Sequence, residues 1–123
     1  MADITHEAGR FGVAEIGDEA QEVVLVVILD TKNKINAIHR VFTGSLNTSV
    51  AHPREIFRSA LLNNGARILV YHNHPSGNTE PSEADLIFTK RMEEAGSILG
   101  IDLLDHIIVS GKEWLSLREY GLL

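Results

Sequence analysis

Val23–Leu29 reads VVLVVIL, an aliphatic run that no polar residue interrupts. Aliphatic and β-branched residues favour a strand, and a run without alternation indicates burial on both faces of a sheet. The run is far shorter than the roughly 20 residues that a membrane-spanning helix needs. The segment therefore predicts a buried strand of a globular domain.

Strands and helices alternate along the rest of the chain. Turn residues follow this aliphatic run, and Lys34–Thr43 alternates well enough to form a second strand, in an antiparallel hairpin with the first. The further predicted elements are a helix from Pro53 to near Asn63, a strand at Ala66–Tyr71, a helix from Ser82 to Gly96 or Leu99, a strand at Ile101–Val109 and a short strand at Glu113–Leu117.

The order of these elements indicates how the first three strands run. A helix between the second and third strands makes a crossover, which predicts that those two strands are parallel. The first strand is antiparallel to the second, and hence also to the third. If the first and third strands are neighbours, Glu22 at the start of one lies at the same sheet edge as His72 at the end of the other.

The third strand leads into the motif HNHPSGNTEPSEAD, residues 72–85. Side chains two residues apart on an extended strand point the same way, so His72 and His74 can present ring nitrogens to one point. A catalytic zinc takes three protein ligands from His, Asp and Glu and leaves a fourth position for water. The motif therefore predicts a metal site with Asp85 as the third ligand. The alternative is a pair of solvent-exposed loop histidines.

Asp85 has a second interpretation. Ser82-Glu83-Ala84-Asp85 has the form S-x-x-D, a variant of the capping box at a helix start. A carboxylate in that position is favourable beside the helix dipole without any metal. From this segment alone, capping and coordination explain Asp85 equally well. Ser82 suits both, because its oxygen can accept an N–H while its hydroxyl donates elsewhere.

Composition limits the classes of function. The chain has 123 residues, which predicts one domain with a real core. It contains no cysteine, which excludes disulfides and thiolate metal sites. Its net charge of −6 argues against a duplex-DNA binder, which normally shows a basic face. No signal-peptide pattern opens the chain and no membrane span is expected, so a cytoplasmic location is predicted.

Several separate motifs resemble the RadC proteins of bacteria, a branch of the JAMM (MPN) metallopeptidases. They are DTKN at residues 30–33, SVAHPRE at 49–55, HNHPSG at 72–77 and DHIIV at 105–109, and they follow the family's order. The resemblance begins at about Glu22, which divides the chain into an N-terminal extension, residues 1–21, and a RadC-like metallopeptidase domain, residues 22–123. It implies a three-layer α/β/α sandwich with a mixed central sheet, similar to the JAMM and cytidine-deaminase folds.

The same resemblance implies a zinc (Zn2+) hydrolase that cleaves a peptide or isopeptide bond in a peptide or protein substrate. The residues that it implies are His72, His74 and Asp85 as metal ligands, Glu22 as general acid and base, and Ser82 as the residue that steadies the oxyanion. Glu22 is preferred to the glutamates further upstream because the family has its glutamate immediately before the first apolar strand.

Two alternatives belong to other classes of function. RadC proteins carry a DNA-repair name, and members commonly have a helix-hairpin-helix region before this domain, so one alternative is a DNA-repair-associated role. The other is a metal-stabilised binding module without peptidase activity. Two further zinc enzymes are weaker candidates, because the thermolysin-like H-E-x-x-H is absent and nucleobase deaminases need a P-C-x-x-C.

Other residues of the matched motifs have smaller expected roles. Asn73, Ser76 and Gly77 are expected to shape the metal loop, glycine by permitting a turn that other residues resist. His52 is expected at a helix start rather than at the metal. Asp105 and His106 are expected as a buried, hydrogen-bonded pair within a strand, and the alternative is that they support the metal ligands.

Overall fold

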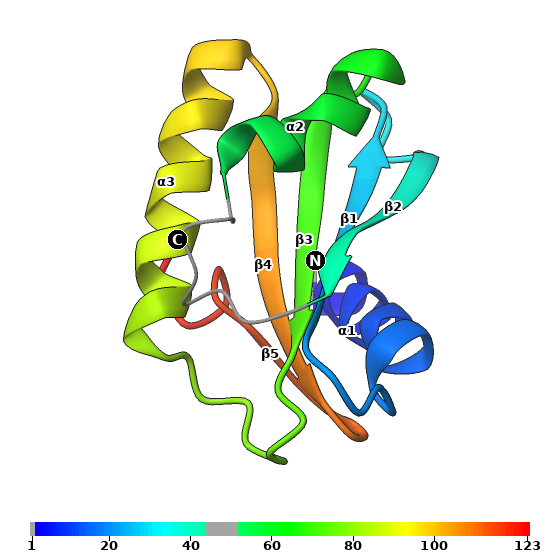
Figure 1. Cartoon of the computed structure of the whole chain (residues 1–123). Coiled ribbons are helices and arrows are strands. Elements are labelled where there is room, and N and C mark those ends of the chain that lie inside the picture. Colours follow the sequence, from blue (N-terminus) through cyan, green and yellow to red (C-terminus); the bar gives the residue numbers. More distant parts are fainter. Residues whose placement is uncertain (1, 44–51) are drawn as a thin grey trace.

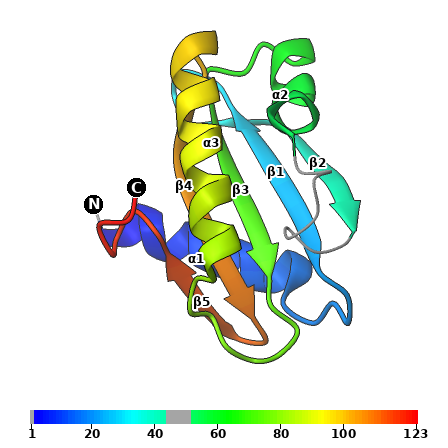
Figure 2. The same ribbon diagram turned by 60° about the vertical axis from the view of Figure 1, so that its left-hand side comes forward.

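The computed structural model describes residues 2–43 and 52–123; the first three residues of the SVAHPRE motif lie outside these ranges. Its elements are α1 (Ala2–Ile16), β1 (Val23–Leu29), β2 (Ile35–Thr43), α2 (Pro53–Leu62), β3 (Arg67–Asn73), α3 (Glu83–Leu99), β4 (Asp102–Ser110) and β5 (Glu113–Ser116). The strands form one mixed sheet in the order β2-β1-β3-β4-β5, with helices on both faces (Figures 1 and 2). The predicted fold class, a three-layer α/β/α sandwich, is confirmed.

Strand β1 lies between β2 and β3, and every one of its residues is buried. Because successive side chains on a strand point to opposite faces, β1 contributes to two separate cores. Val24, Val26 and Ile28 pack in the core beneath α2 and α3. The alternate residues of β1 pack in the core beneath α1. The absence of alternation in this run therefore reflects helices on both sides of the sheet.

Helix α1 lies in a part of the chain for which the sequence predicted no element. It packs against the sheet through close contacts at two glycines. A Cβ atom at Gly9 would lie 2.1 Å from Trp114 Cδ2, and one at Gly12 would lie 2.5 Å from Tyr71 Cδ2. Glycine lowers helix propensity by about 1 kcal/mol relative to alanine, which hides the helix from a sequence-based prediction. The same missing side chains let the helix approach the two aromatic rings.

The strand directions agree with the predicted topology. β1 is antiparallel to both β2 and β3, and β3 is parallel to β4. Val24 pairs with His72, so the residue before β1 lies at the sheet edge where β3 ends. The predicted strand at Ala66–Tyr71 ended too early, because the backbones of His72 and Asn73 still pair with β4. Their polar side chains had suggested a loop.

Helices α2 and α3 pack on the same face of the sheet, and both begin and end as their capping residues predict. Pro53 opens α2 after His52, and Ser82 is the N-cap of α3. Gly100 ends α3 in the left-handed conformation, with a φ of 74°. The N-terminus of α3 thus returns to the sheet edge where β3 ends (Figure 2). Within residues 2–43 and 52–123, no helix combines the length and apolar character that crossing a membrane requires.

Candidate metal centre

Three potential metal ligands meet at the sheet edge where β3 ends. His72 is the second-last residue of β3, His74 follows the strand, and Asp85 lies in the first turn of α3. One ligand atom from each of them lies within 4.8 Å of the others. His74 Nε2 is 3.0 Å from Asp85 Oδ2, and His72 Nδ1 is 3.3 Å from Asp85 Oδ1. The side chains expected as ligands are thus close enough to hold one metal ion.

Burial differs across this cluster. The side chains of His72 and Asp85 are only 2% and 1% exposed, whereas that of His74 is 14% exposed. Glu22 borders the cluster with a side chain that is 29% exposed, and its Oε1 lies 3.2 Å from His72 Nε2. The cluster therefore has a buried side, formed by the strand and helix, and a side that solvent reaches near Glu22. Two imidazoles and a carboxylate form a ligand set typical of catalytic zinc.

Asp85 performs the capping role and faces the histidines at the same time. Its Oδ2 accepts the Ser82 backbone N–H at 2.8 Å, and its own backbone N–H donates to Ser82 Oγ at 3.1 Å. These two bonds form a capping box. Oδ1 meanwhile lies beside His72. The two interpretations that the sequence left open are therefore compatible, because a carboxylate has two oxygens and about four acceptor positions.

Both ring nitrogens of His72 are buried without a hydrogen-bond partner in the part of the chain that the structure describes. Their contacts with Asp85 and Glu22 fall within ion-pair distance but lack hydrogen-bond geometry. Buried side-chain nitrogens are seldom left unpaired in folded proteins. A metal ion at this position would use a lone pair of His72, so the residues present fit a bound zinc ion.

The charges of the cluster suit a ligand set. Burial raises the pKa of the Asp85 carboxyl, but the contacts with His72, His74 and the Ser82 N–H outweigh it and hold the pKa well below its usual range. Asp85 is therefore ionised, as a metal ligand must be. Its hydrogen bond to His74 raises the pKa of that imidazole, with burial acting in the opposite direction.

Outer residues orient the candidate ligands, and the sequence did not identify them. Asn78 O lies 2.9 Å from His74 Nδ1, which directs Nε2 of that ring towards Asp85. Thr89 Oγ1 donates to Asp85 O at 2.8 Å and lies 2.6 Å from His106 Nδ1. Because a hydroxyl has one proton, Thr89 must accept a hydrogen bond from His106. Helical spacing could have signalled Thr89, which lies one turn after Asp85.

Burial also decides the charge of His106. Complete burial lowers the pKa of this imidazole to about 3, so the ring is neutral. A neutral ring with its proton on Nδ1 matches the hydrogen bond to Thr89. The expected burial and hydrogen bonding of Asp105 and His106 are confirmed, and the bond that joins them runs from the His106 backbone to the Asp105 carboxylate. Asp105 also accepts a hydrogen bond from the hydroxyl of Ser116.

Two other expectations have different outcomes. Gly77 has a φ of 96°, so the turn after His74 requires the conformational freedom of glycine, as predicted. Asn73 does not shape this loop. Its side chain bonds backbone groups of residues 19–23, far upstream in the sequence. The prediction for Asn73 was wrong because the side chain of a strand residue next to His72 points to the opposite face of the sheet.

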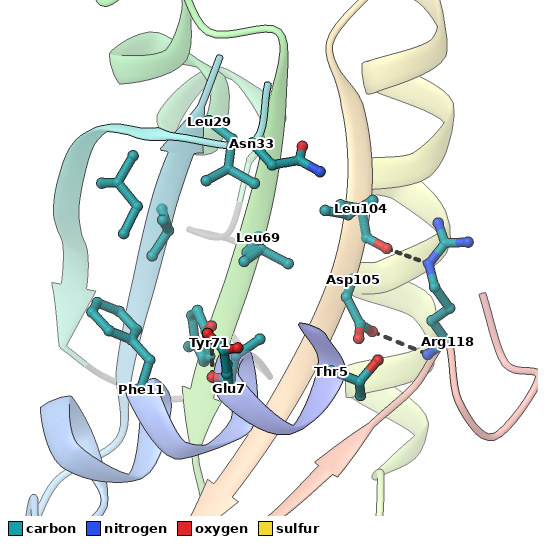
Figure 3. A pocket seen from close by; sticks show the side chains of 13 residues that line it. Thr5, Glu7, Phe11, Leu29, Asn33, Leu69, Tyr71, Leu104, Asp105 and Arg118 are labelled. Carbon is teal, nitrogen blue, oxygen red and sulfur yellow. Dashed lines mark hydrogen bonds between the residues drawn. The ribbon is translucent and has the colours of Figure 1, made fainter. Parts of the chain in front are cut away.

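A separate cavity of about 540 Å3 lies on the other face of the sheet, against α1 (Figure 3). Phe11 and Tyr71 contribute apolar lining, and Asp105 and Arg118 contribute polar groups. Asp105 Oδ1 accepts the Arg118 backbone N–H at 3.0 Å. The cavity is lined by none of the three candidate ligands, so it is distinct from the candidate metal centre.

Known proteins resemble this chain over most of its length. The model of the RadC-like JAB domain matches residues 4–122. A UPF0758 protein of Clostridium beijerinckii is 50% identical over 111 residues, which are 90% of this chain and 48% of that protein. A UPF0758 protein of Enterococcus faecalis is 57% identical over 99 residues, which are 80% of this chain and 43% of that protein. The chain spans about half the length of the curated relatives it matches.

Proposed function

Because the chain belongs to the RadC-like JAB domain family, we propose that it is a zinc-dependent metallohydrolase of the JAMM type that cleaves a peptide or isopeptide bond. The observation that carries the proposal is the convergence of His72, His74 and Asp85 within 4.8 Å of one another. The unpaired, buried nitrogens of His72 support a metal ion at this point. The adjacent carboxylate of Glu22 supports a hydrolytic role for that ion.

His72, His74 and Asp85 would hold the zinc ion through two imidazoles and one carboxylate. When bound, zinc supplies Lewis acidity, which activates water and polarises a carbonyl group. The capping box and the Asn78 contact hold Asp85 and His74 in place before any metal arrives. Ligands that are already oriented lose less conformational freedom on binding, so this arrangement favours affinity.

Glu22 is the proposed general acid and base. Its carboxylate lies 3.2 Å from the His72 ring, and its side chain is 29% exposed, so both water and a substrate can reach it. Glu22 would accept a proton from the attacking water and deliver it to the leaving amine, a transfer worth about a hundredfold to ten-thousandfold in rate.

Ser82 is the proposed donor to the oxyanion that forms when the carbonyl is attacked. The residue is exposed at the N-terminus of α3, on the same short segment as Asp85. Its oxygen accepts the Asp85 N–H, which leaves the hydroxyl proton free to donate in another direction. The positive end of the α3 dipole would favour negative charge at this point.

The test is hydrolysis by zinc-loaded protein of a fluorogenic library that contains linear peptides and lysine-linked isopeptides. Cleavage should disappear with a chelator and return with added zinc. Glu22→Gln is the matched control, because it keeps the size of the side chain and removes the proton acceptor. Cleavage that Glu22→Gln retains in full would assign the activity to another carboxylate or to a contaminant, and no cleavage by any zinc-loaded sample would reject the proposal.

A metal-stabilised binding module is the second candidate, and the near-complete burial of His72 and Asp85 favours it. Structural zinc sites contribute folding energy directly, and such domains unfold without their metal. Chelation separates the two functions. A peptidase should keep its circular dichroism spectrum and lose only hydrolysis, whereas a structural zinc module should unfold.

The substrate and the location of the protein are also proposals. We expect a peptide or protein as substrate because the chain belongs to the RadC-like JAB domain family. The names of its curated relatives state no activity. The cytoplasmic location expected from the sequence stays a prediction, which fractionation of the producing cells would check.

A further inference from the structure

Asn73 lies between the two candidate histidine ligands in the sequence, yet its side chain points to the opposite face of the sheet. It is 1% exposed and shares a face with Tyr71, two residues earlier on β3. Tyr71 belongs to the core beneath α1. Asn73 therefore cannot act as a ligand beside His72 and His74, and its buried amide must have another purpose.

The amide of Asn73 bonds three backbone groups of one short segment. Val23 N–H donates to Oδ1 at 2.6 Å, and Nδ2 donates to Gln21 O at 3.0 Å and to Glu19 O at 3.3 Å. The N–H can only donate and the carbonyls can only accept, so the positions of oxygen and nitrogen in the amide are determined by their partners. All three hydrogen-bonding positions lie at or near the start of β1.

These bonds begin where the backbone ladder stops. The pairing of β1 with β3 ends at Val24 and His72. Beyond this pair, the Asn73 side chain replaces backbone pairing and holds the chain on both sides of Glu22. With its neighbouring backbone groups held, Glu22 needs only its own side-chain torsions to reach its position 3.2 Å from His72 Nε2.

The two faces of β3 therefore contribute to the position of Glu22 in different ways. Val23 points into the core beneath α1, so the preceding residue, Glu22, points towards the face that carries His72. His72 meets the Glu22 carboxylate on one face, while Asn73 holds the Glu22 backbone from the other. Neighbouring residues on β3 therefore determine both the backbone and the side-chain position of the proposed proton acceptor.

We propose that Asn73 is a positioning residue for Glu22, an inference that rests on the proposed role of Glu22 in hydrolysis. Asparagine is required because the site needs one acceptor and two donors on a single short side chain. Aspartate could accept from Val23 but could not donate to the carbonyls of Gln21 and Glu19. Alanine would leave three backbone groups without their partner.

The first experiment uses metal-free protein and does not depend on activity. In Asn73→Ala, hydrogen exchange at the Val23 amide should accelerate about tenfold, the factor expected from losing one hydrogen bond. The nuclear Overhauser contact between the side chains of Glu22 and His72 should weaken. Tyr71→Phe is the matched control, because it lies on the same strand and face and loses one hydrogen bond, to Ala8 O. It should leave both signals unchanged.

The second experiment measures zinc affinity, kcat and KM for the same variants. Asn73→Ala should retain its zinc affinity and KM and lose about tenfold to a hundredfold in kcat, part of the contribution of a well-placed general base. Tyr71→Phe should keep the wild-type kcat. If Asn73→Ala does not fold, Asn73→Ser should show the same changes to a smaller extent, because its hydroxyl is too short to make all three bonds.

The outcomes separate this inference from the proposed function. Unchanged Val23 exchange, an unchanged contact between Glu22 and His72, or an unaltered kcat in Asn73→Ala would each overturn the positioning role. Wild-type protein that hydrolyses no substrate would reject the proposed function, and the two measurements on metal-free protein would then still decide whether Asn73 positions Glu22.

Discussion

Ser82 and Asp85 form two hydrogen bonds with each other across the first turn of α3, and the same Asp85 carboxylate lies beside both candidate histidine ligands. Helix capping therefore orients a potential metal ligand. A local interaction within the helix thus holds the carboxylate in addition to its contacts with the histidines. Capping and metal binding can therefore be separated by mutation, because both residues form the capping box but only Asp85 is a candidate metal ligand.

Asp85→Asn should greatly weaken zinc binding while changing the stability of the metal-free protein little. A neutral amide is a poor ligand, whereas the lost charge at the helix start is worth roughly 0.3 to 1 kcal/mol. Zinc affinity and urea unfolding of the metal-free variant check this. Ser82→Ala is the matched control: it should lose about 0.5 to 2 kcal/mol of stability through the cap and keep most of its zinc affinity. Zinc binding by Asp85→Asn at wild-type strength would contradict the three-ligand site.

Zinc should bind with one ion per chain, and His72→Ala should lose most of it. The variant removes one of three ligands, and the catalytic type of site has no spare protein ligand. Elemental analysis of protein dialysed against zinc gives the stoichiometry. His52→Ala is the control, because this exposed histidine stands before α2 and is not part of the cluster. An undiminished zinc content in His72→Ala would remove His72 from the ligand set.

Asp105→Asn should change how stability depends on pH. Burial raises the pKa of Asp105, although bonds from Ser116 and Arg118 act in the other direction. A carboxyl whose pKa is raised by folding stabilises the fold below its unfolded pKa, and this contribution is lost as pH rises through the folded pKa. Between about pH 4 and neutrality, the wild type should therefore lose stability relative to the variant. Urea unfolding of both metal-free proteins across this range tests the sign, and parallel curves would contradict it.

Duplex DNA should bind this chain weakly and without sequence preference. The net charge of −6 leaves few phosphate contacts, and the affinity that salt removes scales with the number of such contacts. Fluorescence anisotropy of a labelled duplex at two salt concentrations measures the affinity and its dependence on salt. Tight binding with a steep salt dependence, unaffected by removal of zinc, would favour the DNA-repair-associated role over hydrolysis.

The sequence by itself determined the features that depend on neighbouring residues. The apolar run at Val23–Leu29 predicted the buried strand β1, and its uniform burial followed from helices on both faces. Pro53 and Ser82 marked the starts of α2 and α3. The H-x-H pair and the later aspartate predicted a cluster that the structure brings within 4.8 Å. Periodicity, capping and turn chemistry are local, so the order of residues alone reveals them.

Only the tertiary structure decided the contacts between distant segments. Helix α1 was missed because Gly9 and Gly12 lower its helix propensity, and the aromatic rings that they allow to pack closely lie far along the chain. The role of Asn73 was missed because its partners are backbone groups of residues 19–23, and backbone groups carry no sequence signal. The candidate metal ligands share one segment. The position of Glu22 depends instead on the register of β1 and β3 and on the Asn73 amide, whose contacts exist only once these strands have paired.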